Sequence, residues 1–129
     1  MIERIYPPGA AAPRGPYSPG ARAGEFIYVS GQVPVDPVTN QIVSGDVKAE
    51  TRQVLSNIQR ILEGAGATMA DVVKCSVFLT DIRDFAAMNE VYTEFFGDIK
   101  PARSTIGVAA LPLSGAKVEI DAIAYKGGA

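Results

Sequence analysis

The sequence predicts an α+β fold: a mixed six-stranded sheet with two helices on one face. Two observations lead to this prediction. Apolar residues recur at intervals of three and four in two long segments, which is typical of helices with one buried stripe. They alternate with small or polar residues in several shorter segments, which is typical of strands with one buried face. The length of 129 residues suits a single domain, residues 1–129, around one core.

The first 45 residues predict short extended segments joined by turns. Residues 1–6 are expected to form a first strand. The segment 7–16 is rich in proline and glycine and indicates an ordered irregular loop, with a disordered tail as the alternative. Residues 26–30 are mostly β-branched or aromatic and predict a strand. The turn expected at 36–40 makes Asn40 a candidate for the left-handed conformation.

The first helix is expected to begin after an N-cap at Asp46 and to end at Gly64 and Gly66. Its apolar stripe consists of Val47, Val54, Leu55, Ile58, Ile61, Leu62 and Ala65. The polar and charged residues mostly lie off this stripe and predict a solvated face: Lys48, Glu50, Arg52, Gln53, Gln59, Arg60 and Glu63. A small capping turn is predicted at Thr68 and Asp71.

The second helix is expected to start within residues 81–84 and to stop at Gly97. Asn89 is the polar exception beside its apolar face. That face consists of Phe85, Met88, Tyr92, Phe95 and Phe96.

Three further strands are predicted, at 73–80, 103–109 and 117–126, and the last two are expected to pair as a closing hairpin. The end of the chain, residues 126–129, is expected to fray. Cys75 is expected to be a small buried hydrophobic residue rather than a nucleophile. It should share a strand face with Val73, Val77 and Leu79.

The composition excludes several classes of protein. Twelve basic and fourteen acidic residues give a net charge of −2, whereas proteins that bind nucleic acid usually have a basic excess. No apolar run is long enough to cross a bilayer, and the first residues lack the layout of a signal peptide. We therefore expect a cytoplasmic protein with neither a nucleic-acid nor a membrane partner.

The chain has no histidine and a single cysteine. Catalysis by Ser-His-Asp or Cys-His groups, metal ligation by histidine, a disulfide within the chain and a cysteine zinc cluster are thereby excluded. Any chemistry must rest on charged and hydroxyl side chains, backbone groups and water. We expect no metal site.

Among the charged residues, Arg103 and Glu119 are the best candidates for binding or catalysis. Pro101 forces an extended backbone before Arg103, and a guanidinium held at the mouth of a strand can grip a planar carboxylate with two parallel hydrogen bonds. Glu119 lies between Val118 and Ile120, so its side chain should point to the opposite face from theirs. The alternative is that both are surface charges on half-exposed strands.

Around these two residues the sequence resembles the signature of the RidA family, also called YjgF/YER057c/UK114, the reactive-intermediate imine deaminases. The motifs that carry the resemblance, in the family's order and spacing, cover nearly the whole chain. They are Gly15-Pro16-Tyr17-Ser18, Val29-Ser30-Gly31-Gln32, Pro34-Val35-Asp36-Pro37, Phe85-x-x-Met88-Asn89, Tyr92-x-x-Phe95-Phe96, Pro101-Ala102-Arg103-Ser104-x-Ile106-x-Val108, Leu111-Pro112 and Val118-Glu119-Ile120.

The resemblance implies a chorismate-mutase-like architecture assembled as a homotrimer. It also implies an enzyme that hydrolyses reactive 2-imino or 2-enamino acids, such as 2-aminoacrylate and 2-iminopropanoate, to 2-oxo acids and ammonia. Such a 2-iminobutanoate/2-iminopropanoate deaminase needs no metal and no organic cofactor.

The resemblance further implies catalytic roles for two residues. Arg103 would clamp the substrate carboxylate. Glu119 would favour the cationic iminium and hold the attacking water.

The substrate-binding residues implied by the resemblance are Tyr17, Ser30, Gly31, Asn89 and Thr105. Ser30 and Gly31 would complete the grip on the carboxylate, and Tyr17 would close the pocket. The asparagine that matches Asn89 lies near the family's site. Thr105 stands where several family members carry a cysteine, so the subgroup stays open, although a hydroxyl can still donate a hydrogen bond.

The expected hairpin separates the two catalytic candidates. If Ala110 and Lys117 flank its turn, Arg103 lies opposite Ala124. In the same register Glu119 lies about five residues further along, or roughly 16 Å at the usual strand rise. A small substrate cannot span that distance, so either the register is wrong or the two residues meet across a subunit boundary. The resemblance favours sites at the boundaries between subunits.

Three alternatives remain at this stage. The chain could be a ligand-binding or regulatory trimer without turnover, because Arg103 would serve that role equally well. It could deaminate another enamine, such as 2-aminomuconate. It could cleave RNA, an activity attached to some family members, although the absence of histidine and of an aromatic–basic stacking face argues against this.

Overall fold

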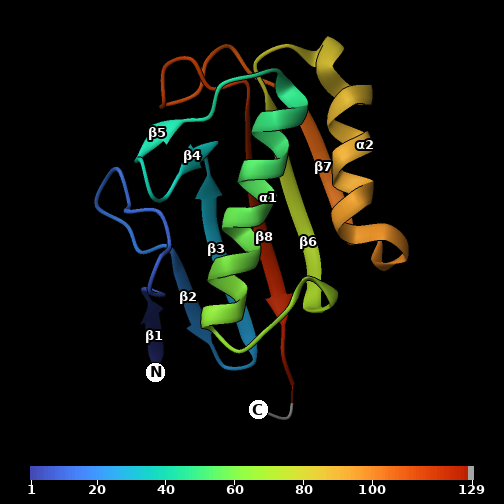
Figure 1. Ribbon diagram of the computed structural model, residues 1–129. Helices are drawn as coiled ribbons and strands as arrows, with labels where there is room; N and C mark the ends of the chain where they lie inside the picture. The colour runs from blue at the N-terminus through green and yellow to red at the C-terminus, as the bar shows by residue number, and fades with distance from the viewer. Residues whose placement is uncertain (128–129) are drawn as a thin grey trace.

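The computed structural model describes residues 1–127 and confirms the predicted fold class (Figure 1). The main sheet has six strands in the order β1-β2-β3-β8-β6-β7, and only the β6–β7 pair is parallel. These strands are β1 (Ile2–Ile5), β2 (Gly20–Ala23), β3 (Phe26–Gln32), β8 (Val118–Tyr125), β6 (Val72–Leu79) and β7 (Ala102–Gly107). Two shorter strands, β4 (Val35–Asp36) and β5 (Gln41–Ile42), pair separately.

Both helices lie on the same face of the sheet (Figure 1). The first, α1 (Val47–Gly64), packs over β3 and β8, and the second, α2 (Phe85–Phe96), lies beside α1 towards β7. Single turns of 3₁₀ helix precede β6 and flank α2, at Met69–Asp71, Ile82–Asp84 and Gly97–Ile99. No helix in residues 1–127 covers the opposite face, which is therefore open.

The core lies between the two helices and the central strands. On β8 every second residue faces the helices and is at most 1% exposed, as in Val118, Ile120, Ala122 and Ala124. The helices contribute apolar residues that are at most 3% exposed, among them Val54, Leu55, Ile58, Ile61, Leu62, Met88, Val91 and Phe96. Burial of this stripe fixes which face of each strand looks towards the helices.

The local predictions for the first half of the chain are confirmed at several points. Asn40 adopts a positive φ of 60° in the turn between β4 and β5. The carboxylate of Asp46 caps α1 by accepting hydrogen bonds from the backbone amides of Lys48 and Ala49, each at 3.1 Å. The segment between β1 and β2 is an irregular loop, in which the backbone amide of Tyr17 donates to the carbonyl of Gly15 at 2.9 Å.

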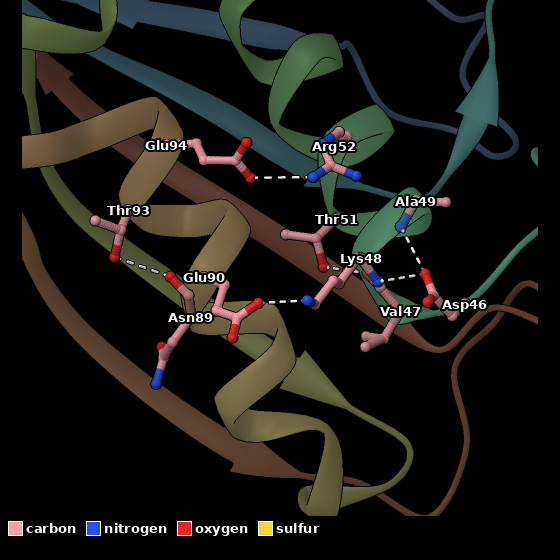
Figure 2. Close-up of polar contacts among 10 residues, drawn as sticks. All are labelled: Asp46, Val47, Lys48, Ala49, Thr51, Arg52, Asn89, Glu90, Thr93 and Glu94. Atoms are coloured by element: carbon pink, nitrogen blue, oxygen red, sulfur yellow. Dashed lines mark hydrogen bonds and ion pairs between the residues drawn. The ribbon is translucent and has the colours of Figure 1, made fainter.

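The two helices are linked across their exposed sides by ion pairs, which Figure 2 shows. Lys48 of α1 pairs with Glu90 of α2, and one turn further along Arg52 pairs with Glu94 at 3.1 Å. These pairs are solvent-exposed, so each contributes little to stability. They lie beside the buried apolar contact between α1 and α2.

The prediction of a solvated polar face on α1 is wrong at Glu50, which is 1% exposed. One carboxylate oxygen of Glu50 accepts a hydrogen bond from the backbone amide of Lys117 at 2.7 Å, and the other pairs with the Lys117 ammonium at 3.2 Å. The first turn of α1 lies against the start of β8, where this buried carboxylate satisfies the backbone amide of Lys117.

The predicted closing hairpin is also wrong, because β6 lies between β7 and β8. Arg103 is level with Cys75 in the parallel β6–β7 pair, and not with Ala124. Glu119 is level with Phe78 in the antiparallel β6–β8 pair. The crossover from β6 through α2 returns β7 to the edge, and the more apolar β8 takes the central place between β3 and β6.

Cys75 is fully buried, as predicted, but Val73 does not share its face. The register of β6 against β8 shifts between Val72 and Lys74, so Val72 points into the core and Val73 is 44% exposed. This bulge inserts one residue and reverses the alternation on one side of it.

The frayed end predicted for 126–129 falls in part on residues 128–129, which lie outside the described residues. Within residues 1–127, no helix is long and apolar enough to span a membrane.

Candidate functional site

A cavity of about 460 Å³ opens where β3 and β8 meet on the open side of the sheet. It is lined by Arg14, Tyr17, Ser30, Gly31, Val33, Pro112, Leu113 and Glu119. Four of the seven residues predicted for the site, Tyr17, Ser30, Gly31 and Glu119, therefore lie together. Sequences far apart in the chain converge here because β3 and β8 are neighbours in the sheet.

Gly31 and Glu119 form the floor of this cavity. A β-carbon added at Gly31 would lie 2.3 Å from one carboxylate oxygen of Glu119, so any other residue here would displace that carboxylate. The register of β3 against β8 shifts between Val29 and Gln32, which places Ser30 and Gly31 in an irregularity of the strand. The backbone of Gly31 is thus accessible beside the acid.

The N-terminal loop supplies one wall of the cavity. The Ser30 hydroxyl donates to the carbonyl of Ser18 at 2.6 Å, and the Ser30 backbone amide donates to the carbonyl of Pro19 at 2.9 Å. The hydroxyl of Tyr17 accepts a hydrogen bond from the backbone amide of Arg14 at 3.2 Å. The loop is therefore tied both to β3 and to itself, which holds Tyr17 at the cavity.

Glu119 is half-buried, and burial raises the pKa of its carboxyl above the usual value of 4.5, with the neighbouring carboxylate of Asp121 adding to the effect. Asp121 is itself held by a hydrogen bond from the Ser76 backbone amide at 3.1 Å. A carboxyl with a raised pKa next to a second acid is typical of functional sites. A cation bound in the cavity would stabilise the ionised form of the Glu119 carboxyl.

Arg103 occupies a different place, between the edge strand β7 and α2. Its guanidinium carbon lies 4.7 Å from the ring centroid of Tyr92 and 5.6 Å from that of Phe85. Within residues 1–127 it forms no ion pair with a carboxylate. Two aromatic faces therefore hold the cation on one side, and its hydrogen-bond donors remain available for an anion.

The side chains of Cys75 and Tyr92 beneath Arg103 are buried. Cys75 is 0% exposed, and burial raises the pKa of its thiol to about 11, so the thiol stays protonated at neutral pH. The hydroxyl of Tyr92 is buried without a hydrogen-bond partner within the described residues, and burial raises its pKa as well. Neither group is poised to act as a nucleophile or base.

Asn89 and Thr105 belong to the same region as Arg103. Thr105 lies two residues from Arg103 on β7, so both side chains point to the helix side of the sheet. Asn89 lies one turn beyond Phe85 and one turn before Tyr92 on α2, so the three side chains share a stripe. Figure 2 shows the Asn89 amide directed away from α1.

The seven predicted residues thus fall into two groups on opposite faces of the sheet. Glu119 alternates with Val118 and Ile120, which point into the core under the helices, so it faces the open side. Arg103 faces α2. From the strand pairing, the two residues are offset by about 10 Å along the strands and about 10 Å across them.

Sequence reasoning missed three residues of these groups. Phe85 and Tyr92 were placed on the apolar face of the second helix, and Tyr92 is indeed part of the core. Their contact with Arg103 was not predicted, although their spacing with Asn89 on one helical stripe was a signal that all three face the same side. Arg14 was taken as part of the loop, and nothing in its local pattern distinguishes it from an ordinary surface arginine. In the part of the chain that the structure describes, no cluster of three or more acidic or cysteine side chains could hold a metal ion.

Comparisons with known proteins show the family to which the chain belongs. The family model described as Endoribonuclease L-PSP matches residues 8–126. A RutC family protein of Pyrococcus horikoshii is 52% identical over 126 residues, which cover 98% of this chain and 99% of that protein. A protein of Capra hircus named 2-iminobutanoate/2-iminopropanoate deaminase is 48% identical over 128 residues, covering 98% and 93%. The crystal structure of Escherichia coli TdcF with bound serine matches with a TM-score of 0.90 at 40% identity, covering 96% of this chain and 98% of that one.

The chain therefore belongs to the YjgF/RidA family, whose model covers nearly all of it.

Proposed function

We propose that this protein hydrolyses 2-imino acids, or their 2-enamino tautomers, to 2-oxo acids and ammonia. The observation that carries the proposal is the cavity whose floor is the half-buried carboxylate of Glu119. The chain also presents, on the other face of the sheet, the guanidinium of Arg103, which has no carboxylate partner within residues 1–127. The name of the Capra hircus relative, 2-iminobutanoate/2-iminopropanoate deaminase, supports the same reaction class.

The chemistry suits a site without histidine or metal. An iminium carbon is already electrophilic, so the protein needs only to orient the substrate and to place a water beside that carbon. Arg103 binds the substrate carboxylate through two parallel hydrogen bonds, assisted by the Gly31 backbone. The Ser30 hydroxyl, whose single hydrogen is donated to the Ser18 carbonyl, holds the N-terminal loop beside the substrate. Tyr17 closes the cavity over the substrate.

Glu119 acts on the other end of the substrate. Its carboxylate stabilises the cationic iminium and accepts a hydrogen bond from the attacking water. The water oxygen bonds to the imine carbon, the carbon–nitrogen double bond becomes a single bond, and loss of ammonia then leaves the 2-oxo acid. The water supplies the oxygen and the two hydrogens of the balance, so no cofactor enters the reaction.

We further propose that each site forms between two copies of the chain in a homotrimer. Within one chain the sheet separates Arg103 from Glu119, so one substrate cannot touch both. The open face also exposes large apolar side chains, with Phe26, Tyr28 and Tyr125 each 41–45% exposed and in ring contact. A sheet face of this kind is stabilised when copies of the chain cover it.

The trimer has a direct physical test. Light scattering at micromolar concentration should return three times the chain mass of 13.6 kDa. A monomer mass would contradict the shared site.

The activity is tested by generating imino acids in situ, with an amino-acid oxidase plus catalase or with a threonine dehydratase, and following ammonia release. Addition of the protein should accelerate hydrolysis over the spontaneous rate. Tight binding of the 2-oxo acid product without any acceleration would contradict turnover. That result would favour a ligand-binding protein, the role suggested by the serine bound to TdcF.

A further inference from the structure

Arg14 places a second guanidinium at the candidate cavity. It is the one cation among the residues that line the cavity, and Glu119 is the one anion. The remaining walls are largely apolar, with Val33, Pro112 and Leu113. A cavity of about 460 Å³ has room for a substrate side chain well beyond the three carbons of the smallest imino acid.

Both the backbone and the guanidinium of Arg14 are held in place. Prolines at 13 and 16 restrict the loop backbone, and the Arg14 amide donates to the Tyr17 hydroxyl at 3.2 Å. At the other end, Nη2 of Arg14 donates to the backbone carbonyl of Asn40 at 2.8 Å and to its side-chain oxygen at 3.4 Å. The left-handed turn at Asn40 thus serves as an anchor for the guanidinium.

This anchoring leaves much of the guanidinium unsatisfied. Both acceptors at Asn40 are neutral, and within residues 1–127 Arg14 has no ion pair with a carboxylate. Its Nε and Nη1 donors form no hydrogen bond with the described residues. A guanidinium held through one nitrogen loses little entropy when the other nitrogens bind an anion.

We propose that Arg14 selects imino acids whose side chain ends in a second carboxylate, that is, 2-imino dicarboxylic acids. The inference rests on the proposed imine hydrolysis and names its preferred substrate class. The 2-carboxylate binds Arg103 of the neighbouring chain, the imine lies at Glu119, and the distal carboxylate reaches Arg14. The distal group takes no part in bond changes, so the products are the corresponding 2-oxo dicarboxylic acid and ammonia.

A matched pair of substrates tests this selection. A flavin oxidase converts glutamate to 2-iminoglutarate and glutamine to the corresponding amide, and the two imines have nearly the same shape but differ by one charge. The wild-type protein should hydrolyse 2-iminoglutarate with kcat/KM about tenfold higher than its amide, the factor expected of one charge-assisted contact at a partly solvated site. Added salt should reduce the ratio, because screening weakens an exposed contact.

Substitutions test whether Arg14 is the cause of the preference in kcat/KM for 2-iminoglutarate over its amide. Arg14→Met should bring the ratio close to one, Arg14→Lys should keep part of it, and Arg52→Met, a charge removal on α1 outside the cavity, should leave it unchanged. A ratio near one in the wild type, or an unchanged ratio in Arg14→Met, would overturn the inference. If no imine is hydrolysed faster than in buffer, the proposed function itself fails, whereas hydrolysis of the alanine-derived imine without a charge preference removes the role of Arg14 alone.

Discussion

Arg103 and Glu119 lie on opposite faces of one sheet. Arg103 is on the edge strand β7, with its guanidinium over the rings of Tyr92 and Phe85 on α2. Glu119 is on the central strand β8 and points to the open side, beside Gly31. Because β6 separates the two strands, the proposed site would take Arg103 from one chain and Glu119 from another.

Replacement of Arg103 tests the carboxylate clamp. Arg103→Ala should lower kcat/KM for imine hydrolysis about a hundredfold or more, because two charge-assisted hydrogen bonds are each worth roughly 1.5–3 kcal/mol. Arg103→Lys should also be impaired, since an ammonium cannot reproduce the planar fork. The melting temperature should change little, because the loss is confined to a cation–π contact of about 1 kcal/mol. Near-normal rates in a folded Arg103→Ala variant would remove Arg103 from the site.

Gly31→Ala tests the contact between β3 and the carboxylate of Glu119, the proposed catalytic acid. The added β-carbon would lie 2.3 Å from the Glu119 carboxylate, so the acid must move away from the substrate. We expect activity to fall at least tenfold. The matched control is Gly107→Ala on β7, where a β-carbon would meet no atom closer than 3.5 Å. Equal activity in the two variants would show that the position of Glu119 does not matter for turnover.

Glu119 should make the stability of the protein depend on pH. Its folded-state pKa is raised, mainly by burial and further by Asp121. The folded state therefore favours the protonated acid, and this contribution is fully present below pH 4.5 and is lost as the pH rises through the folded-state pKa. Glu119→Gln should be more stable than the wild type at pH 7, and the difference should disappear near pH 4. Chemical denaturation at both pH values measures it, and a constant difference would contradict the raised pKa.

The same shift should appear in the activity. In the proposed mechanism the ionised form of Glu119 acts on the substrate. Acidification should therefore begin to lower the rate of hydrolysis at a pH above the ordinary pKa of glutamate. Asp121→Asn keeps an oxygen for the Ser76 amide and removes the neighbouring charge. The acid limb of its kcat/KM profile should therefore move to lower pH. A limb that stays in place would show that Asp121 does not influence Glu119.

Glu50 should be important for stability although it is remote from the chemistry. Glu50→Ala leaves the Lys117 backbone amide without its acceptor and creates a cavity, which should cost about 2–4 kcal/mol of unfolding free energy. Glu50→Gln retains an oxygen for that amide and should cost less. Urea unfolding measures both variants, and the same loss in the two would show that the charge, rather than the hydrogen bond, is what matters.

Both helices and most strands could be predicted from the sequence, because they follow local periodicity, whereas β2 (Gly20–Ala23) was not predicted. The stripe of α1, the cap at Asp46 and the turn at Asn40 are all local features, and all are present. Strand neighbours depend on contacts between distant segments. The sequence places β7 and β8 side by side along the chain, but the crossover through α2 puts β6 between them.

The site, too, could be predicted in its local features but not in its long-range arrangement. The identities of Arg103, Glu119 and the five substrate-binding candidates came from resemblance, whereas their separation onto two faces depends on the sheet order. Glu50 was misjudged because a glutamate off an apolar stripe is usually solvated, and only the packing of α1 on the start of β8 makes it a buried acceptor. Val73 was misplaced because a bulge leaves no clear mark in an alternating sequence.

The shared site makes one direct prediction about mixed assemblies. Arg103→Ala and Glu119→Ala homotrimers should each be nearly inactive. When they are unfolded together in equal amounts and refolded, about one interface in four should receive an intact Arg103 from one chain and an intact Glu119 from its neighbour. Imine hydrolysis should then return to roughly a quarter of the wild-type rate, in mixed trimers verified by native mass measurement. Activity that stays at the level of the single variants would contradict a site shared between chains.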